Sequence, residues 1–233
     1  SQHGGPLSAS TVQCWKDEGI SFAIVQYSVL MTQQLQVLAE AGMEAEAYVY
    51  LYWGTSPWGQ TPLDRTRAAL TFIKHFNVKR LWLDCEDTDH AYREGQLVEC
   101  VDACQRVGIE PGIYTGAWWW VPHTANSHVF AFLPLWDARY VDEQPSNMDD
   151  FESYGGWEKP EIWQWHNTTT LCGHSVDLNV MEDEMPEPTQ PTETEALRAL
   201  VNAGAIIVAG DQSLADLSEA DKNALLWITS QFG

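Results

Sequence analysis

Short apolar runs with strand character alternate with helical segments along the first half of the chain, and this alternation limits the possible folds more than any other feature. Most runs are almost continuously apolar, which is typical of strands buried on both faces. Neighbouring parallel strands need a crossover helix between them, so the pattern predicts a parallel sheet. Seven strands are predicted, at 21–28, 46–53, 80–87, 111–116, 133–140, 161–167 and 175–181.

Helical segments between the early strands carry recognisable end signals. Thr32 is expected to cap the first of them, and Thr61 with Asp64 forms a capping-box pattern at the start of the second. Gly108 follows the end of the third, where a left-handed backbone is common. The predicted helices are 31–42, 61–76 and 91–108.

Beyond about residue 131 the predicted strands follow one another with few helices between them. An eight-stranded closure is the natural barrel for a parallel sheet with crossover helices, so an eighth strand is expected before Ser1. The sequence therefore predicts an irregular, TIM-like α/β barrel over residues 1–181.

The composition changes after the last predicted strand. Residues 182–195 are rich in acidic side chains and proline and carry no base, which indicates a solvated, extended linker. Residues 196–233 have the pattern of a small helical module, with a second helix starting at Ser218. A piece this short buries little surface alone, so it is expected to dock on the main domain, on another subunit or on a virion.

The charge balance excludes several classes of partner. The chain has 12 Lys and Arg against 33 Asp and Glu, a net charge of -21. Nucleic acids and anionic membrane surfaces both need clustered cations, so neither is expected as a partner. No run of about 18 apolar residues predicts a membrane span, and the polar opening SQHGGPLSAS does not have the pattern of a signal peptide.

The five cysteines are scattered and odd in number, which does not suggest a disulfide framework. Cys100 and Cys104 share one helical stripe with apolar residues and are expected in the core. We therefore expect free thiols and synthesis in a reducing compartment. The histidines show no metal-ligand spacing, including His123 and His128 in a Trp-rich segment, so neither a metal nor a cofactor is expected.

Catalytic residues of a parallel barrel lie at the carboxyl ends of its strands. Asp84 and Glu86 stand two apart at the end of an apolar strand, so they point to the same face. Repulsion between two carboxylates beside an apolar wall would raise the pKa of one of them, which suits an acid/base pair. The alternative for this D-x-E pattern is an ordinary strand exit into an acidic loop, since Asp87 and Asp89 follow.

Other strand ends carry aromatic and polar side chains suited to the two-sided surface of a sugar. The alternative is core packing, which we favour for Trp82 and Trp163 in the middle of strands. Three consecutive tryptophans after PGIYTGA cannot all point inward, so at least one is expected to be exposed in a loop at the barrel mouth. The candidate ligand-binding residues are Tyr52, Tyr114, Trp118, Asp137, Tyr140, Gln164 and Trp165, with Asp177 as a further carboxylate.

Four segments together carry a resemblance to a known family. LWLDCED, PGIYTGAWW, LPLWDARY and EIWQWHNTTTLCGHSVDLNV occur in this order in a chain that resembles the glycoside hydrolase family 25 lysozymes over residues 1–181. These are muramidases, often phage endolysins or virion-associated lysins, that cleave the β-1,4 bond between N-acetylmuramic acid and N-acetylglucosamine. The resemblance implies an irregular (β/α)5β3 barrel, with an aspartate on a first strand that would lie before Ser1.

The resemblance also implies roles for individual residues. Glu86 matches the acid that protonates the leaving oxygen, while Asp84 and Asp177 match carboxylates that stabilise positive charge or orient the N-acetyl group. The residues that match the groove lining are Tyr114, Trp136, Tyr140 and Gln164. The implied partner is the glycan strand of peptidoglycan, and the implied place of action is the bacterial cell wall, reached through a phage holin or on a virion.

Three other functions remain open from the sequence. The first is a non-catalytic glycan-binding module that keeps the groove, and the second is a structural phage component that carries the domain for local wall digestion. The third is a chitin hydrolase, which lacks support because the D-x-x-D-x-D-x-E pattern is missing.

Overall fold

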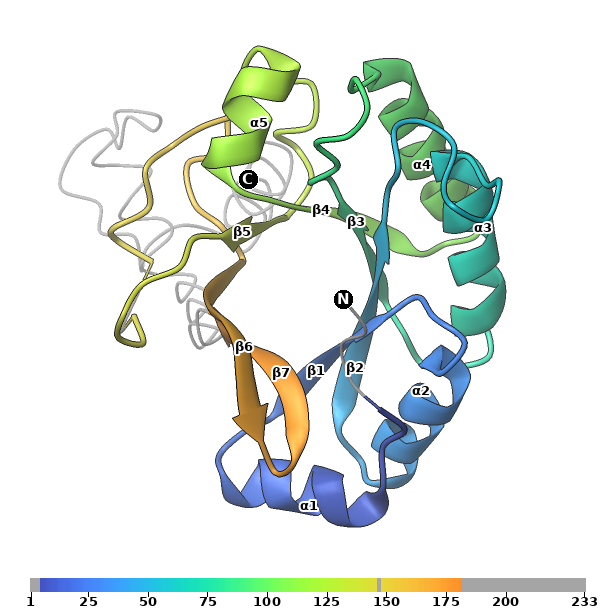
Figure 1. The fold of residues 1–233 in the computed structure, drawn as a ribbon, viewed down its shortest axis with the longest axis vertical. Helices are drawn as coiled ribbons and strands as arrows, with labels where there is room; N and C mark the ends of the chain where they lie inside the picture. Colours follow the sequence, from blue (N-terminus) through green and yellow to red (C-terminus); the bar gives the residue numbers. More distant parts are fainter. Residues whose placement is uncertain (1–4, 146–147, 182–233) are drawn as a thin grey trace, which may run out of the picture. The chain divides into compact units, whose positions relative to one another are not determined.

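A computed structural model describes residues 5–145 and 148–181 of the chain. All seven predicted strands are present in this part, together with five helices (Figure 1). The strands are β1 (Phe22–Gln26), β2 (Glu44–Tyr50), β3 (Arg80–Asp84), β4 (Glu110–Thr115), β5 (Leu135–Ala138), β6 (Ile162–Leu171) and β7 (His174–Met181). The helices are α1 (Ala9–Asp17), α2 (Met31–Glu40), α3 (Pro62–Ile73), α4 (Glu94–Arg106) and α5 (Ala117–Thr124).

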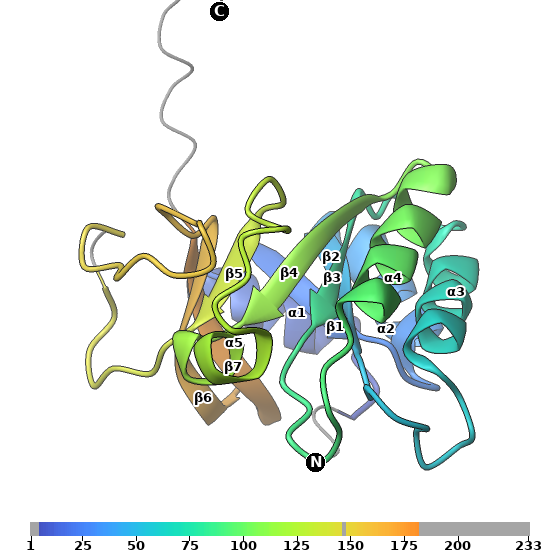
Figure 2. The same cartoon turned by 90° about the horizontal axis from the view of Figure 1, so that it is seen from above.

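The strands form one sheet in sequence order, β1 to β7. Neighbours from β1 to β6 are parallel, and β6 and β7 form an antiparallel pair. The sheet curls around a central space, with α2, α3 and α4 on its outer side (Figures 1 and 2). The predicted α/β class is therefore confirmed as a curled, mixed half-barrel. The closed (β/α)5β3 form stays a prediction, and the linker at 182–195 and the module at 196–233 lie outside the described residues.

Alternation along each strand divides the buried residues between the two sides of the sheet. On β3, Leu81 and Leu83 face the helices and belong to the large outer core. Trp82 lies between them and points into the curl, where it packs with Tyr114 and Trp136 in a second, smaller core. The inner core on this face of the half-barrel is therefore rich in aromatic rings.

Most of the predicted helix signals are confirmed. Thr61 accepts a hydrogen bond from the backbone N–H of Asp64 at 3.2 Å, and the Asp64 carboxylate accepts one from the Thr61 N–H at 3.1 Å, which is the capping box. Cys100 and Cys104 are fully buried on α4, as expected. The predicted Thr32 cap is wrong, because α2 already begins at Met31 and its first turn has no side-chain cap.

The three consecutive tryptophans lie on a helix, so the expected loop is wrong. Residues Ala117–Thr124 form α5, which starts directly after β4. Trp119 and Trp120 are fully buried, whereas Trp118 is 54% exposed. Helical spacing explains the split, because consecutive residues are rotated by about 100° and cannot share one face.

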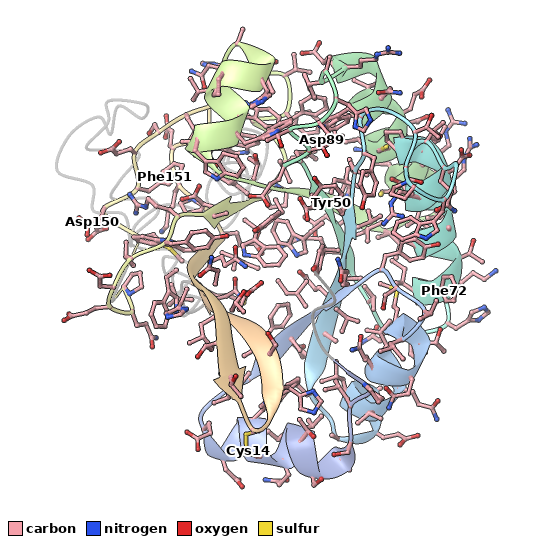
Figure 3. All side chains as sticks on the ribbon, in the orientation of Figure 1. Cys14, Tyr50, Phe72, Asp89, Asp150 and Phe151 are labelled. Atoms are coloured by element: carbon pink, nitrogen blue, oxygen red, sulfur yellow. A yellow bond between two sulfur atoms is a disulfide. The ribbon has the colours of Figure 1, made fainter. Side chains whose placement is uncertain are left out.

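Two of the five cysteines form a disulfide, so the expectation of free thiols is wrong for them. Cys14 on α1 is bonded to Cys172 in the turn between β6 and β7, with the two Cα atoms 6.1 Å apart. Figure 3 labels Cys14 at this bond. The remaining cysteines, Cys85, Cys100 and Cys104, are free and buried. The bond joins α1 to the β6–β7 hairpin across 158 residues of sequence.

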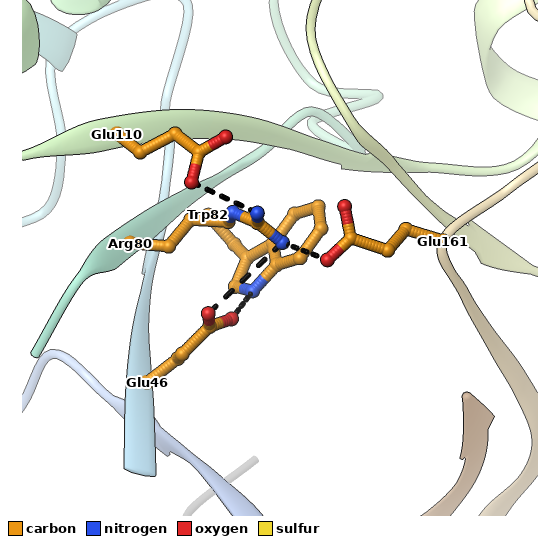
Figure 4. Close-up of polar contacts among 5 residues, drawn as sticks. All are labelled: Glu46, Arg80, Trp82, Glu110 and Glu161. Atoms are coloured by element: carbon orange, nitrogen blue, oxygen red, sulfur yellow. Dashed lines mark hydrogen bonds and ion pairs between the residues drawn. The ribbon is translucent and has the colours of Figure 1, made fainter. Parts of the chain in front are cut away.

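An arginine joins several strands near their amino ends, away from the carboxyl end of β3. Arg80 pairs with Glu161 before β6 and with Glu110 on β4, the latter at 2.9 Å (Figure 4). Glu46 on β2 lies 4.0 Å from the guanidinium and accepts a hydrogen bond of 2.6 Å from the indole N–H of Trp82.

Within the described residues, no helix is long and apolar enough to cross a membrane.

Candidate active site

The site lies where strands β2 to β5 end. Strand pairing aligns Tyr50 on β2, Asp84 on β3, Tyr114 on β4 and Trp136 on β5 in one row across the sheet. Asp84 follows Trp82 on the inner face, and Glu86 comes two residues later. The chain thus brings both carboxyl groups of the predicted pair to the inner side of the curl.

A cavity of about 1540 Å³ occupies this side of the sheet. It is lined by aromatic, amide and carboxyl side chains from β1 to β7 and from the loops after them. Most of the residues proposed from the sequence line it: Tyr52, Asp84, Glu86, Tyr114, Trp136, Tyr140, Gln164 and Asp177. The structure therefore brings the three proposed carboxylates to one cavity.

Three proposed residues do not line the cavity, namely Asp137, Trp118 and Trp165. Asp137 lies between the inward-facing Trp136 and Ala138, and its carboxylate accepts a hydrogen bond of 2.7 Å from Tyr154. Burial raises the pKa of Asp137 to about 6, against the effect of the Tyr154 hydroxyl. Trp118 stands on the exposed side of α5, and Trp165 is half-buried next to Gln164.

Glu86 has the electrostatic character of a general acid. Burial raises the pKa of its carboxyl to about 7, the Tyr114 hydroxyl acts in the opposite direction, and the charge of Asp177 raises it further. A carboxyl with this pKa is about half protonated at neutral pH, so a large fraction of the molecules can donate this proton.

Asp84 is buried more deeply than Glu86, with 4% of the residue exposed. Burial holds the pKa of Asp84 well above its usual range, the charge of Glu86 adds to the rise, and Arg65 lowers it. Burial and the repulsion between the two carboxyls therefore both favour a proton on the pair. One oxygen of each, Oδ1 of Asp84 and Oε1 of Glu86, is buried without a hydrogen-bond partner among the described residues.

Polar side chains beside the pair are already bonded to one another. The hydroxyl groups of Tyr114 and Tyr140 both donate to Oε1 of Gln164, at 2.7 and 3.2 Å. On β7, Asp177 accepts a hydrogen bond of 2.7 Å from the backbone N–H of Thr168. These bonds fix the orientation of side chains that line the cavity around the carboxyl pair.

Two charged residues near the site were missed by the sequence predictions. Asp87 is 1% exposed, and its carboxylate accepts hydrogen bonds from the N–H groups of Trp53 and Asp89 at 2.8 and 2.9 Å. His90 contacts the same carboxylate at 2.8 Å. Asp87 therefore anchors the loop that carries Glu86. In the sequence it is one acid in an acidic run, and nothing distinguishes it from its neighbours.

Arg65 on α3 is the other missed residue, because a lone arginine on an amphipathic helix predicts only a solvated side chain. It is 6% exposed and lines the cavity.

In the described parts of the chain, no group of three or more His, Cys, Asp or Glu side chains is arranged to hold a metal ion.

A family model described as Lys-1: Lysozyme-like protein 1 matches residues 3–165. Lysozyme-like protein 5 of Caenorhabditis elegans is 30% identical over 193 residues, covering 75% of this chain and 86% of that protein. Probable GH family 25 lysozyme 4 of Dictyostelium discoideum is 27% identical over 186 residues, covering 74% and 84%.

Among solved structures, the catalytic domain of endolysin Ply40 from Listeria monocytogenes bacteriophage P40 shares the fold. Its TM-score is 0.56 at 18% identity, over 75% of this chain and 87% of that one. The match to the family model spans most of the described residues, including Asp84 and Glu86. On this evidence, the chain belongs to the lysozyme-like proteins, within the glycoside hydrolase family 25 lysozymes.

Proposed function

We propose that this protein is a peptidoglycan hydrolase that cleaves the β-1,4 bond between N-acetylmuramic acid and N-acetylglucosamine. The observation that carries the proposal is Glu86, which lines the cavity and whose carboxyl has a pKa of about 7. Asp84 and Asp177 line the same cavity. Membership in the lysozyme-like family supports the choice of a glycosidic bond.

In the proposed reaction, protonated Glu86 donates its proton to the glycosidic oxygen as the bond from that oxygen to the anomeric carbon breaks. Positive charge develops on the sugar ring that keeps the anomeric carbon. The negative charges of Asp84 and Asp177 stabilise this charge, or hold the N-acetyl group that does so. Water then supplies the hydroxyl at the anomeric carbon, and its proton returns to the carboxyl pair.

Reducing-end analysis of digested peptidoglycan tests this function. Purified wall is incubated with the protein, reduced with labelled borohydride and hydrolysed to single sugars. Label on muramitol supports the proposed bond, whereas label on glucosaminitol alone shows that the bond is wrong. If no new reducing ends appear, the protein does not hydrolyse the wall, and the proposed function is rejected in favour of a glycan-binding role.

The place of action is also proposed. We infer that the protein works on bacterial walls in an oxidising environment, because the Cys14–Cys172 disulfide persists where thiols are not kept reduced. A phage or virion-associated origin stays a prediction from the sequence, since the matched proteins include a nematode protein, an amoebal protein and a phage endolysin. The docking role of residues 196–233 also stays a prediction.

A further inference from the structure

Arg65 carries a positive charge into a cavity that is otherwise acidic. Among the residues that line the cavity it is the one arginine or lysine, whereas Asp84, Glu86 and Asp177 supply carboxyl groups. The residue belongs to α3 and follows the capping box, so the helix fixes its backbone. The residue is 6% exposed, and its charge acts on Asp84 without forming an ion pair with that carboxyl.

Aromatic rings surround the Arg65 guanidinium. Its central carbon lies 5.3 Å from the ring centroid of Tyr27 and 5.2 Å from those of Tyr52 and Trp58. Each ring is close enough for a cation–π contact, which holds the charge without neutralising it. All three rings also line the cavity.

The hydrogen-bonding capacity of Arg65 is mostly unused. Its Nε donates to the backbone carbonyl of Tyr50 at 2.9 Å. Among the described residues, neither terminal nitrogen has a hydrogen-bond acceptor and no carboxylate lies within 4.0 Å. Arg80, the buried arginine near the strand starts, pairs instead with three glutamates. In contrast to Nε of Arg80, the terminal nitrogens of Arg65 are not enclosed by the described residues, so they remain open to a ligand in the cavity.

We propose that Arg65 and the rings of Tyr27, Tyr52 and Trp58 form a subsite that binds a carboxylate of the glycan strand beside the cleaved bond. This inference rests on the proposed function, and it names the group that distinguishes the substrate. Two terminal nitrogens of a guanidinium match the two oxygens of a carboxylate in a paired geometry, while the rings provide apolar faces for a sugar.

The charge of the whole molecule makes such a subsite necessary. A chain with a net charge of -21 repels an anionic glycan, and the carboxylates in the cavity repel it more strongly at short range. One cation held among aromatic side chains offsets that repulsion locally, because a charge close to the ligand is screened less than distant surface charges. A neutral β-1,4-linked N-acetylglucosamine polymer has no carboxylate, so the charge of Arg65 should not strengthen its binding.

Two carboxylates of peptidoglycan have the required chemistry: the lactyl group of a muramic acid without a stem peptide, and the carboxylates of the stem peptide where one is joined to the lactyl group as an amide. Binding measurements separate them with three probes. N-acetylglucosaminyl-N-acetylmuramic acid has a free lactyl carboxylate, and its muramyl dipeptide derivative has carboxylates only in the peptide. The neutral N,N′-diacetylchitobiose, called chitobiose below, has none. Calorimetry uses the Glu86→Gln background, so that no probe is cleaved and binding does not depend on hydrolysis.

In that background, Arg65→Gln should lose about tenfold or more of the affinity for a carboxylate-bearing probe and leave chitobiose binding unchanged. The matched control is Arg67→Gln, which removes the same charge from an exposed position on α3 and should change neither affinity. The probe that shows the loss identifies the source of the carboxylate. Arg65→Lys keeps the charge but not the paired geometry, so it should show a smaller loss with the same selectivity.

Added salt provides a second measurement. Salt screens the repulsion from the net charge in every variant, so the Arg65 contact is read from a difference: the affinity ratio between the Glu86→Gln protein and Glu86→Gln/Arg65→Gln for the carboxylate probe should shrink from low to high ionic strength, and the ratio for chitobiose should stay near one. Equal losses for all probes in Arg65→Gln, no selective loss, or no binding of either carboxylate probe would overturn the subsite. If the wild-type protein cleaves no peptidoglycan but Arg65→Gln still loses affinity selectively for a carboxylate probe, the proposed function is rejected and the subsite is kept.

Discussion

Glu86 combines a position inside the half-barrel, an unpaired oxygen and a pKa of about 7. Its role as an acid requires the protonated form. As the pH rises through about 7, that form disappears, so kcat/KM for glycan cleavage should fall on the alkaline side. Burial is the largest influence on the Glu86 pKa and raises it, while the Tyr114 hydroxyl favours the charged form and moves this fall to lower pH.

Replacing Tyr114 by phenylalanine should move the alkaline limb of the pH profile to higher pH. The change removes the hydroxyl that lowers the Glu86 pKa, and the pKa should therefore rise. The measurement is kcat/KM against pH on a soluble glycan fragment. Tyr154→Phe is the control, because that hydroxyl bonds to Asp137 outside the cavity. A limb that stays in place, or moves to lower pH, contradicts the role of Tyr114.

At the scale of elements, α5 supports the loop that carries Glu86. The Trp119 indole N–H donates to the backbone carbonyl of Asp87 at 3.0 Å, and Trp119 is fully buried. Helix α5 therefore contacts the loop that carries Glu86, and none of the helix residues lines the cavity.

Alanine replacements should separate the two faces of α5. Trp119→Ala should cost about 3–5 kcal/mol of unfolding free energy, because it opens a large cavity in the core. Trp118→Ala removes a side chain that is 54% exposed and should cost no more than about 0.5 kcal/mol. Urea unfolding of both variants measures the difference. Similar losses of unfolding free energy in the two variants would show that α5 does not bury Trp119 and expose Trp118 as described.

The disulfide between α1 and the β6–β7 hairpin fixes the element that carries Asp177. Thiol titration of the denatured protein without reductant should find three free cysteines, and five after reduction. Cross-links of this kind contribute about 2–4 kcal/mol, so the double variant Cys14→Ser/Cys172→Ser should melt at a lower temperature. Five thiols before reduction would show that the bond does not form.

At the scale of the whole molecule, the sequence predicts the strands and their order well. Near-continuous apolar runs and capping signals identify them without tertiary information. The same runs hide which residues face inward, because both faces of β5 are buried. Trp136 and Asp137 are therefore equally good candidates in the sequence, and only the register of β5 with β4 decides between them.

Other features depend on contacts that sequence patterns do not reveal. Cys14 and Cys172 are 158 residues apart, and only the fold brings them together. Arg65 looks like a surface residue until the rings of Tyr27 and Trp58 are placed around it. Asp84 and Glu86, in contrast, needed only the alternation of a strand.

The net charge of -21 should make wall digestion depend on salt. Repulsion between the protein and an anionic wall reaches about 30 Å at 0.01 M salt and about 8 Å at 0.15 M. The rate of turbidity loss should therefore rise between these two conditions. Walls stripped of anionic polymers serve as the control and should show little change. A rate that falls with salt on intact walls would mean that attraction, not repulsion, governs the encounter.

The central claim is that Glu86 is the proton donor of a glycosidase. The most direct test compares reducing ends released from purified peptidoglycan by the wild type, Glu86→Gln and Glu99→Gln, an exposed glutamate on α4. We predict that Glu86→Gln loses about 10²–10⁴-fold of the rate while it stays folded, and that Glu99→Gln keeps the wild-type rate. A wild-type rate in a folded Glu86→Gln protein would contradict the claim.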